Sequence, residues 1–311
     1  MKRRITYLLL LIVCPLWGWA QINTERVMAI GRNALYFEDY VLSIQYFNEV
    51  INAKPYLADP FFFRGLAKLN LDDFPGAEND CSEAIERNPF VVNAYQVRGL
   101  ARIQQNKLDD AVKDYVKALE LDPENIALWH NLSLCRIRQK DYDGAEKDLD
   151  RLLIIAPKYT KAYLMRGEVN LKQKDTLTAE RDFNRAIEID RYDPDTWASR
   201  AMLYLMKEQY KDAETDLGKA IHLSVRNPGL YVNRALSRYH QNNLRGAMAD
   251  YDLALDIDPN NFIGHYNRGL LRAQVGDDNR AIEDFNFVIE MEPDNMMAIF
   301  NGHNMKAYYF D

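Results

Sequence analysis

Small and apolar residues return along this chain at intervals of 34 positions. One series of small residues shows the interval: Gly31, Gly65, Gly99, Ser133, Gly167, Ala201, Ala235 and Gly269. A second series, which includes Ala77, lies twelve residues later, and a third, which includes Ala84, follows after seven more. The pattern divides the chain into eight consecutive units without an insertion or a deletion: 24–57, 58–91, 92–125, 126–159, 160–193, 194–227, 228–261 and 262–295.

Within each unit the apolar positions form two runs with the 3.6-residue period of an α-helix. A polar turn such as Asp72-Asp73 separates the two runs, so each unit predicts a helical hairpin. Proline ends the second helix of most units at the same place: Pro55, Pro89, Pro123, Pro157, Pro259 and Pro293. The fifth and sixth units have Arg191 and Val225 there, and we expect slightly longer turns after their second helices.

We number the positions of a unit as places 1 to 34. In most units, place 4 is aromatic, place 8 is small, place 20 is alanine and place 32 is proline. These features together resemble the tetratricopeptide repeat family. The resemblance implies an all-α solenoid, a right-handed superhelix of eight hairpins within residues 21–295. Residues 296–311 would begin the first helix of an incomplete ninth unit.

The N-terminus has the three parts of a secretory signal peptide, which we expect over residues 1–20. Lys2, Arg3 and Arg4 precede an apolar stretch that is too short to span a membrane, and a small-residue cleavage site ends at Ala20. We therefore expect an exported protein in the periplasm or cell envelope of a Gram-negative-type bacterium, with no membrane span after the signal is removed. Lipid anchoring at Cys14 is a weaker alternative, because Val13 is a poor residue for the preceding position.

Composition and motifs narrow the function further. The chain has 39 basic and 46 acidic side chains, a net charge of −7, which argues against a nucleic-acid partner. The histidines are at least 18 residues apart, and we find no phosphate-binding loop and no nucleophile elbow. We therefore expect no catalytic residue, no metal and no cofactor. We expect Cys81 and Cys135 to be small buried residues rather than a disulfide.

A charge pair recurs at places 7 and 23, which lie at one level of an antiparallel hairpin. The predicted structural pairs are Arg64 with Asp80, Arg98 with Asp114, Arg166 with Asp182, Arg200 with Asp216, Arg234 with Asp250, and Arg268 with Asp284. The fourth unit breaks the rule with Leu132 opposite Asp148. Pairing of each aspartate with the arginine of the next unit is the competing geometry.

Partner-binding residues follow from the resemblance, which implies that the first helices line a concave groove. The candidates at places 5, 6 and 9 are Phe62, Gln96, His130, Asn131, Leu134, Asn233, Leu236, Tyr266, Asn267 and Phe300. Part of this stripe is expected to be core, more so at place 9 than at place 5. The place-6 amides resemble the asparagine ladder of O-linked N-acetylglucosamine transferase and kinesin light chain, which holds peptides by their main chain. Solvated asparagines are the simple alternative.

These observations favour a non-catalytic scaffold that holds an extended protein or peptide segment in its groove. A structural spacer, which contacts partners by its convex face or its ends, remains an alternative. A second alternative is the targeting part of a longer enzyme. Residues 296–311 contain one lysine and one aspartate, so we expect self-association through the C-terminal end or further repeats beyond it.

Overall fold

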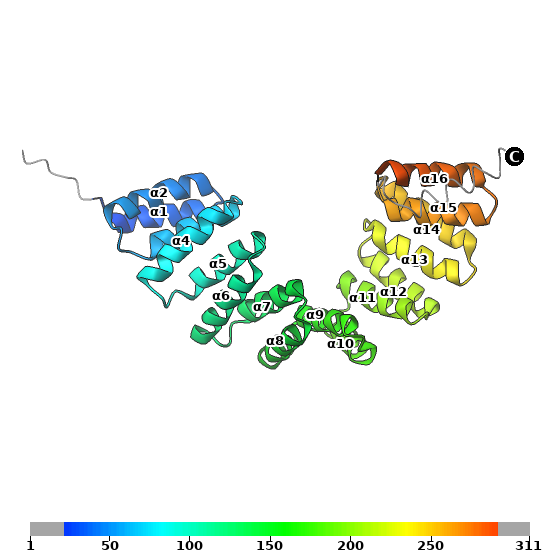
Figure 1. Ribbon diagram of the computed structural model, residues 1–311, viewed down its shortest axis with the longest axis horizontal. Coiled ribbons are helices and arrows are strands. Elements are labelled where there is room, and N and C mark those ends of the chain that lie inside the picture. The colour runs from blue at the N-terminus through cyan, green and yellow to red at the C-terminus, as the bar shows by residue number, and fades with distance from the viewer. Residues whose placement is uncertain (1–21, 292–311) are drawn as a thin grey trace, which may run out of the picture. The chain divides into compact units, whose positions relative to one another are not determined.

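The computed structural model describes residues 22–291, and these residues form helices and turns without a strand (Figure 1). The chain divides into two compact units, Met1–Pro123 and Glu124–Asp311. The first contains α1 (Thr24–Tyr36), α2 (Tyr40–Ala53), α3 (Asp59–Asn70), α4 (Phe74–Arg87), α5 (Val92–Gln104) and α6 (Leu108–Leu121). The second contains α7 (Ile126–Gln139), α8 (Tyr142–Ile155), α9 (Thr160–Lys172), α10 (Thr176–Ile189), α11 (Pro194–Met206), α12 (Tyr210–Leu223), α13 (Pro228–His240), α14 (Leu244–Ile257), α15 (Phe262–Gln274) and α16 (Asp278–Met291). The all-α class expected from the sequence is confirmed.

Successive helices pack in pairs, α1 with α2 through α15 with α16, and we number these pairs as hairpins one to eight. The odd-numbered helix of a hairpin is its first helix and the even-numbered helix is its second. The first helices also contact one another, α1 with α3 and α3 with α5 in one compact unit, and α9 with α11 and α11 with α13 in the other. A partner that lies along one face of such first helices can therefore contact several hairpins at once.

The turn within each hairpin depends on one residue in the left-handed conformation at place 15. These residues have φ between 57° and 80°: Glu38, Asp72, Asn106, Lys140, Lys174, Glu208, Asn242 and Gly276. The next residue caps the second helix in most hairpins, as Asp73 does by accepting a hydrogen bond from the backbone N–H of Gly76. Such a cap satisfies a donor that the helix itself leaves unpaired.

The second helices of hairpins five and six end at the same place as the others. Four residues, 190–193 and 224–227, join them to the next helix, as four residues do after α4, α6, α8 and α14. The prediction of longer turns after Arg191 and Val225 was therefore wrong. The backbone N–H of Asp190 closes α10 by donating to the carbonyl of Ala186, so the helix ends without a proline at place 32.

The core of each hairpin explains why place 8 is small. A Cβ added to Gly167 would lie 2.5 Å from the ring of Phe183, and one added to Gly31 would lie 2.7 Å from the ring of Phe47. Ala77 and Ala84 are fully buried in the second helix of their hairpin. Close helix packing at these positions leaves no room for a larger side chain.

Cys81 and Cys135 are both buried and do not form a disulfide with each other, as the sequence predicted. Burial raises the pKa of the Cys81 thiol to about 12, so it stays protonated. Among the described helices, none combines the length and the apolar character needed to cross a lipid bilayer. The predicted signal peptide, residues 296–311 and Phe300 lie outside the described residues.

Candidate functional site

Each arginine at place 7 binds the aspartate of its own hairpin through two nitrogens. Arg64 Nε and Nη2 donate to the two carboxylate oxygens of Asp80 at 2.8 and 2.6 Å. The same bidentate contact joins Arg98 to Asp114, Arg166 to Asp182, Arg200 to Asp216, Arg234 to Asp250, and Arg268 to Asp284. These aspartates are buried, and a buried carboxylate needs such charged donors to offset its desolvation.

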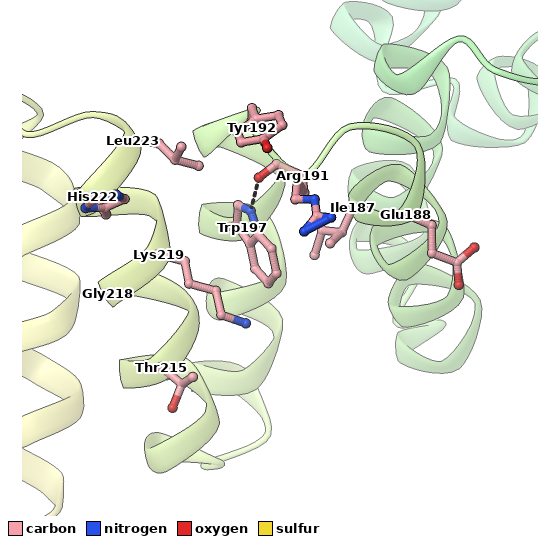
Figure 2. Close-up of a pocket in the computed structure, with 10 residues that line it drawn as sticks. All are labelled: Ile187, Glu188, Arg191, Tyr192, Trp197, Thr215, Gly218, Lys219, His222 and Leu223. Carbon is pink, nitrogen blue, oxygen red and sulfur yellow. Dashed lines mark hydrogen bonds between the residues drawn. The ribbon is translucent and has the colours of Figure 1, made fainter.

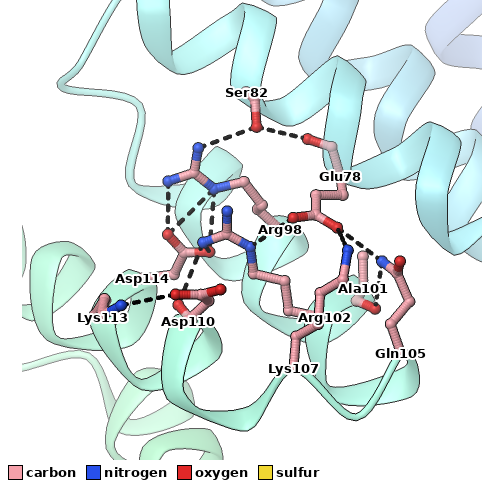
Figure 3. Close-up of polar contacts among 10 residues, drawn as sticks. All are labelled: Glu78, Ser82, Arg98, Ala101, Arg102, Gln105, Lys107, Asp110, Lys113 and Asp114. Atoms are coloured by element: carbon pink, nitrogen blue, oxygen red, sulfur yellow. Dashed lines mark hydrogen bonds and ion pairs between the residues drawn. The ribbon is translucent and has the colours of Figure 1, made fainter.

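A second donor, which the sequence analysis missed, reaches the same aspartate from place 11. Figure 3 shows Arg102 Nη1 on Asp114 at 2.8 Å, beside the bidentate contact of Arg98. The equivalent donors are Lys68, Arg136, Asn170, Arg238 and Arg272. Places 7 and 11 lie one helical turn apart on the same face, so this four-residue spacing was the available signal.

The same arginines also connect neighbouring hairpins. Arg64 Nη1 donates to Asn48 of α2 at 2.6 Å, and Arg98 Nη1 donates to Ser82 of α4 at 3.1 Å. Figure 3 shows a further link, in which Glu78 of α4 accepts from Arg102, Gln105 and Lys107 of the next hairpin. Burial acts to raise the pKa of Glu78, but these hydrogen bonds lower it below the ordinary value. These polar groups thus align hairpins one, two and three with one another.

Hairpin four departs from this arrangement. Leu132 takes the place of the arginine, and within residues 22–291 Asp148 pairs only with Arg136, at 2.9 Å from its Oδ1. Among the described residues, the buried Oδ2 of Asp148 has no hydrogen-bond partner. Burial raises the pKa of Asp148 to about 6, although Arg136 acts to lower it.

The candidate groove residues differ in exposure. Gln96, His130, Leu134, Leu236 and Tyr266 are half-buried on their first helices. Phe62 is only 8% exposed and packs in the core with Cys81 and Val97, so it is not an open surface residue. We call the side of the first helices that carries places 5, 6 and 9 the first-helix face.

Place 9 is more exposed than place 5, which reverses the order expected from the sequence. Met28 and Val232, at place 5, are 9% and 6% exposed, whereas Met202 and Leu270, at place 9, are 41% and 38% exposed. Both places are apolar, so the hydrophobic pattern alone did not separate them. Contact with the neighbouring hairpin decides which one is covered.

Three place-6 amides of the second compact unit remain available for binding. Asn131, Asn233 and Asn267 are half-buried on α7, α13 and α15. None of their side chains forms a hydrogen bond within residues 22–291. Each amide therefore has both a donor and an acceptor free for another molecule.

Two hollows open beside first helices of the second compact unit. One, of about 410 Å³, lies between α9 and α11 and is lined by Glu168, Leu171, Lys172, Ser199, Met202 and Met206. The other, of about 620 Å³, includes His130, Tyr159, Leu164 and Met165. The Tyr159 hydroxyl lies 3.3 Å from Nδ1 of His130, and burial together with the charge of Lys161 lowers the pKa of His130. His130 is therefore mostly neutral near pH 7.

Four tetratricopeptide repeat family models match the chain, over residues 64–126, 102–167, 160–193 and 235–276. Together they cover more than half of its length. The chain belongs to the tetratricopeptide repeat family. In a comparison with curated proteins, no match to the sequence was found.

Several solved protein structures share the fold. A tetratricopeptide repeat protein from Parabacteroides merdae is 21% identical, with a TM-score of 0.63 over 80% of this chain and 98% of that one. Yeast Tom70 is 19% identical, with a TM-score of 0.62 over 92% of this chain and 65% of Tom70. PilF of Pseudomonas aeruginosa is 18% identical, with a TM-score of 0.58 over 70% of this chain and 97% of PilF. These likenesses support an all-α solenoid of helical hairpins.

A tetratricopeptide repeat array of this kind is a protein-interaction scaffold. Within the described part of the chain, no group of three or more histidine, cysteine, aspartate or glutamate side chains is arranged to hold a metal ion. The chemistry that the first-helix face offers is hydrogen bonding by amides and contact by exposed apolar side chains.

Proposed function

We propose that this tetratricopeptide repeat protein holds an extended segment of a partner protein on its first-helix face, without catalysing a reaction. The observation that carries the proposal is the set of unpaired amides of Asn131, Asn233 and Asn267. An amide pairs with a peptide main chain whatever the side chains of that peptide, so a row of them suits an extended segment.

Exposed apolar side chains on α11, which lies between α7 and α13 in chain order, support the same function. Met202 and Met206 are exposed at the hollow between α9 and α11, and methionine side chains adapt to differently shaped partners. Glu168 lines this hollow, and its pKa is raised by burial although the Ser199 hydroxyl donates to it at 3.3 Å. Apolar side chains of the partner segment would enter here while the amides hold its backbone.

We also propose that residues 1–20 direct export, that residues 21–295 act as one array in the cell envelope, and that residues 296–311 begin a further helix. The basic and apolar composition of residues 1–20 supports export. N-terminal sequencing of the protein from fractionated cells tests this part, and a mature chain that begins at Gln21 is the expected result.

The binding proposal is tested by replacing the three amides together, as N131A/N233A/N267A. Cross-linking in intact cells followed by mass spectrometry identifies the partner, and titration calorimetry then measures its affinity. We expect the triple variant to bind at least about tenfold more weakly, because each lost hydrogen bond costs about 1 kcal/mol.

The matched control is N52A/N279A, which removes exposed amides from the second helices α2 and α16. It should bind like the unchanged protein. The proposal would be contradicted if the triple variant bound the partner as tightly as the unchanged protein does and kept an unchanged helical circular dichroism spectrum. Loss of binding in the control alone would favour the alternative in which the second-helix side is the contact surface.

A further inference from the structure

A separate hollow of about 740 Å³ lies on the second-helix side of hairpins five and six (Figure 2). Ile187 and Glu188 of α10 line it together with Arg191 and Tyr192 of the following turn. Trp197 of α11 and Thr215, Gly218, Lys219, His222 and Leu223 of α12 complete it. The volume is within the usual range for ligand sites. The place-6 amides lie on first helices, so this hollow is distinct from the proposed partner surface.

The hollow is open partly because Gly218 has no side chain. Its equivalents at place 25 in other hairpins are larger residues, such as Asn184, Asp150 and Asp252. A Cβ built on Gly218 meets no atom within 4 Å. Space for a side chain is therefore present at this position, and the sequence leaves it unfilled.

The indole of Trp197 forms an aromatic wall that is held in place. Its Nε1 donates to the carbonyl of Arg191 at 2.9 Å, as Figure 2 shows. Nζ of Lys219 stands 4.0 Å from the centre of the ring. Ile187 and Leu223 add aliphatic surface. An apolar side chain that enters the hollow would meet a preformed wall, which lowers the entropy cost of binding.

The lining of the hollow carries two cations, Arg191 and Lys219, and one acid, Glu188. Within residues 22–291, Arg191 forms no ion pair. Lys219 lies 3.9 Å from Asp216, whose two oxygens already bind Arg200 at 2.7 and 2.9 Å. The acid in the lining, Glu188, pairs with Arg185 at 2.8 Å. Uncompensated positive charge is notable in a chain whose net charge is −7.

We propose that this hollow is a second binding site, which takes an acidic peptide segment of a partner protein with one large apolar side chain. The apolar side chain would pack on Trp197, and the flanking carboxylates would pair with Arg191 and Lys219. Charge complementarity selects the acidic segment over a basic one and weakens with added salt.

Fluorescence anisotropy with three labelled pentapeptides and the purified chain tests the proposal. The peptide EDFED is expected to bind at least about tenfold more tightly than EDAED, which lacks the aromatic side chain, and KKFKK, which reverses the charge. Equal affinities for the three peptides would overturn the proposal.

Variants then locate the site. G218L fills the hollow where the structure has space, and R191E/K219E reverses its charge without filling it. Each is expected to weaken EDFED binding by about tenfold. N52A, at an exposed position of α2, should leave it unchanged. Full EDFED binding retained in both site variants would refute this site and leave the amide proposal to its own test.

Discussion

Hairpins four and seven bury the same carboxylate at place 23 and surround it differently. Asp250 of hairpin seven receives two nitrogens of Arg234 and a third from Arg238. Among the residues that the structure describes, Arg136 is the one donor to Asp148 of hairpin four, and Leu132 fills the position of the missing arginine. Both hairpins nevertheless pack in the same way, α7 with α8 and α13 with α14. Apolar packing therefore suffices to form the hairpin. The ion pairs offset the desolvation free energy of the carboxylate that the hairpin buries.

The largest expected effect comes from making hairpin seven resemble hairpin four. R234L removes two of the three donors of Asp250 and leaves its charge buried, so we expect a loss of about 3 kcal/mol in the free energy of unfolding. Urea unfolding of the full chain, with hydrogen exchange of α13 and α14, measures it. R234K keeps the positive charge but not the two-nitrogen contact of the guanidinium group, and it should lose less stability than R234L. A change below about 0.5 kcal/mol in R234L would show that the two hairpins do not differ energetically.

The second prediction concerns the pH dependence of hairpin four. The pKa of Asp148 is about 6 in the folded chain against an ordinary value of 3.8, so the folded chain binds the proton more tightly than the unfolded chain. Stability from this group therefore rises as the pH falls from 7 towards 4, and it is lost as the pH rises through about 6.

The D148N variant isolates this contribution because asparagine does not titrate. Between pH 7.5 and pH 4.5, the unfolding free energy of the unchanged protein should rise relative to that of D148N by about 2 kcal/mol. Carbon-13 NMR titration of the Asp148 carboxyl gives the pKa directly. A pKa of Asp148 near 4, together with a pH-independent difference in unfolding free energy between the unchanged protein and D148N, would contradict this prediction.

The third prediction is the converse change, L132R, which supplies hairpin four with the arginine that hairpin seven has. The new donor should satisfy Asp148 Oδ2 and lower the pKa of Asp148. We expect a gain of about 1 kcal/mol at pH 7.5, because the hydrogen bond to a charged group outweighs the lost burial of leucine. Thermal unfolding at pH 7.5 and pH 4.5 measures it, and the gain should shrink at the lower pH. L132K is the control, because it supplies the positive charge without the two-nitrogen contact of a guanidinium group. Destabilisation at both pH values would mean that the site cannot accept the longer side chain.

The smallest expected effect concerns the hydrogen bond from the place-7 arginine to the preceding hairpin, which Arg234 of hairpin seven does not form within residues 22–291. Arg200 and Arg268 donate Nη1 to Asn184 and Asp252 of the preceding hairpin, but Arg234 meets Gly218 at the equivalent place. G218N supplies an acceptor in open space and should gain about 0.5 kcal/mol. A double-mutant cycle with R234L measures the coupling, and zero coupling would mean that the gain comes from helix propensity alone.

The repeat made the hairpins and their ion pairs accessible to sequence analysis. Arg64 and Asp80 lie in two helices whose register follows from a short turn, so their sixteen-residue separation was enough to infer contact. Asp148 could be identified as an exception because Leu132 stood at the position of the arginine. Local periodicity carries this information, because it fixes which side of a helix each residue occupies.

The exposure of the candidate binding residues required the tertiary structure. Phe62 and Met202 are both apolar residues on first helices, yet one packs in the core and the other reaches solvent. The packing of neighbouring hairpins decides between them, and a pattern within one hairpin does not record it. For the same reason the raised pKa of Asp148 and the unpaired amide of Asn233 emerged only from the structure.

The sequence by itself determined the tetratricopeptide repeat architecture, the helical hairpins and the pairing of arginine with aspartate, since all three follow from helical periodicity and short connections. Only the tertiary structure decided which polar groups stay unsatisfied and where space remains, as at Asp148 and Gly218. Those properties depend on side chains from several helices at once, because burial and hydrogen bonding are set by everything that surrounds an atom in space.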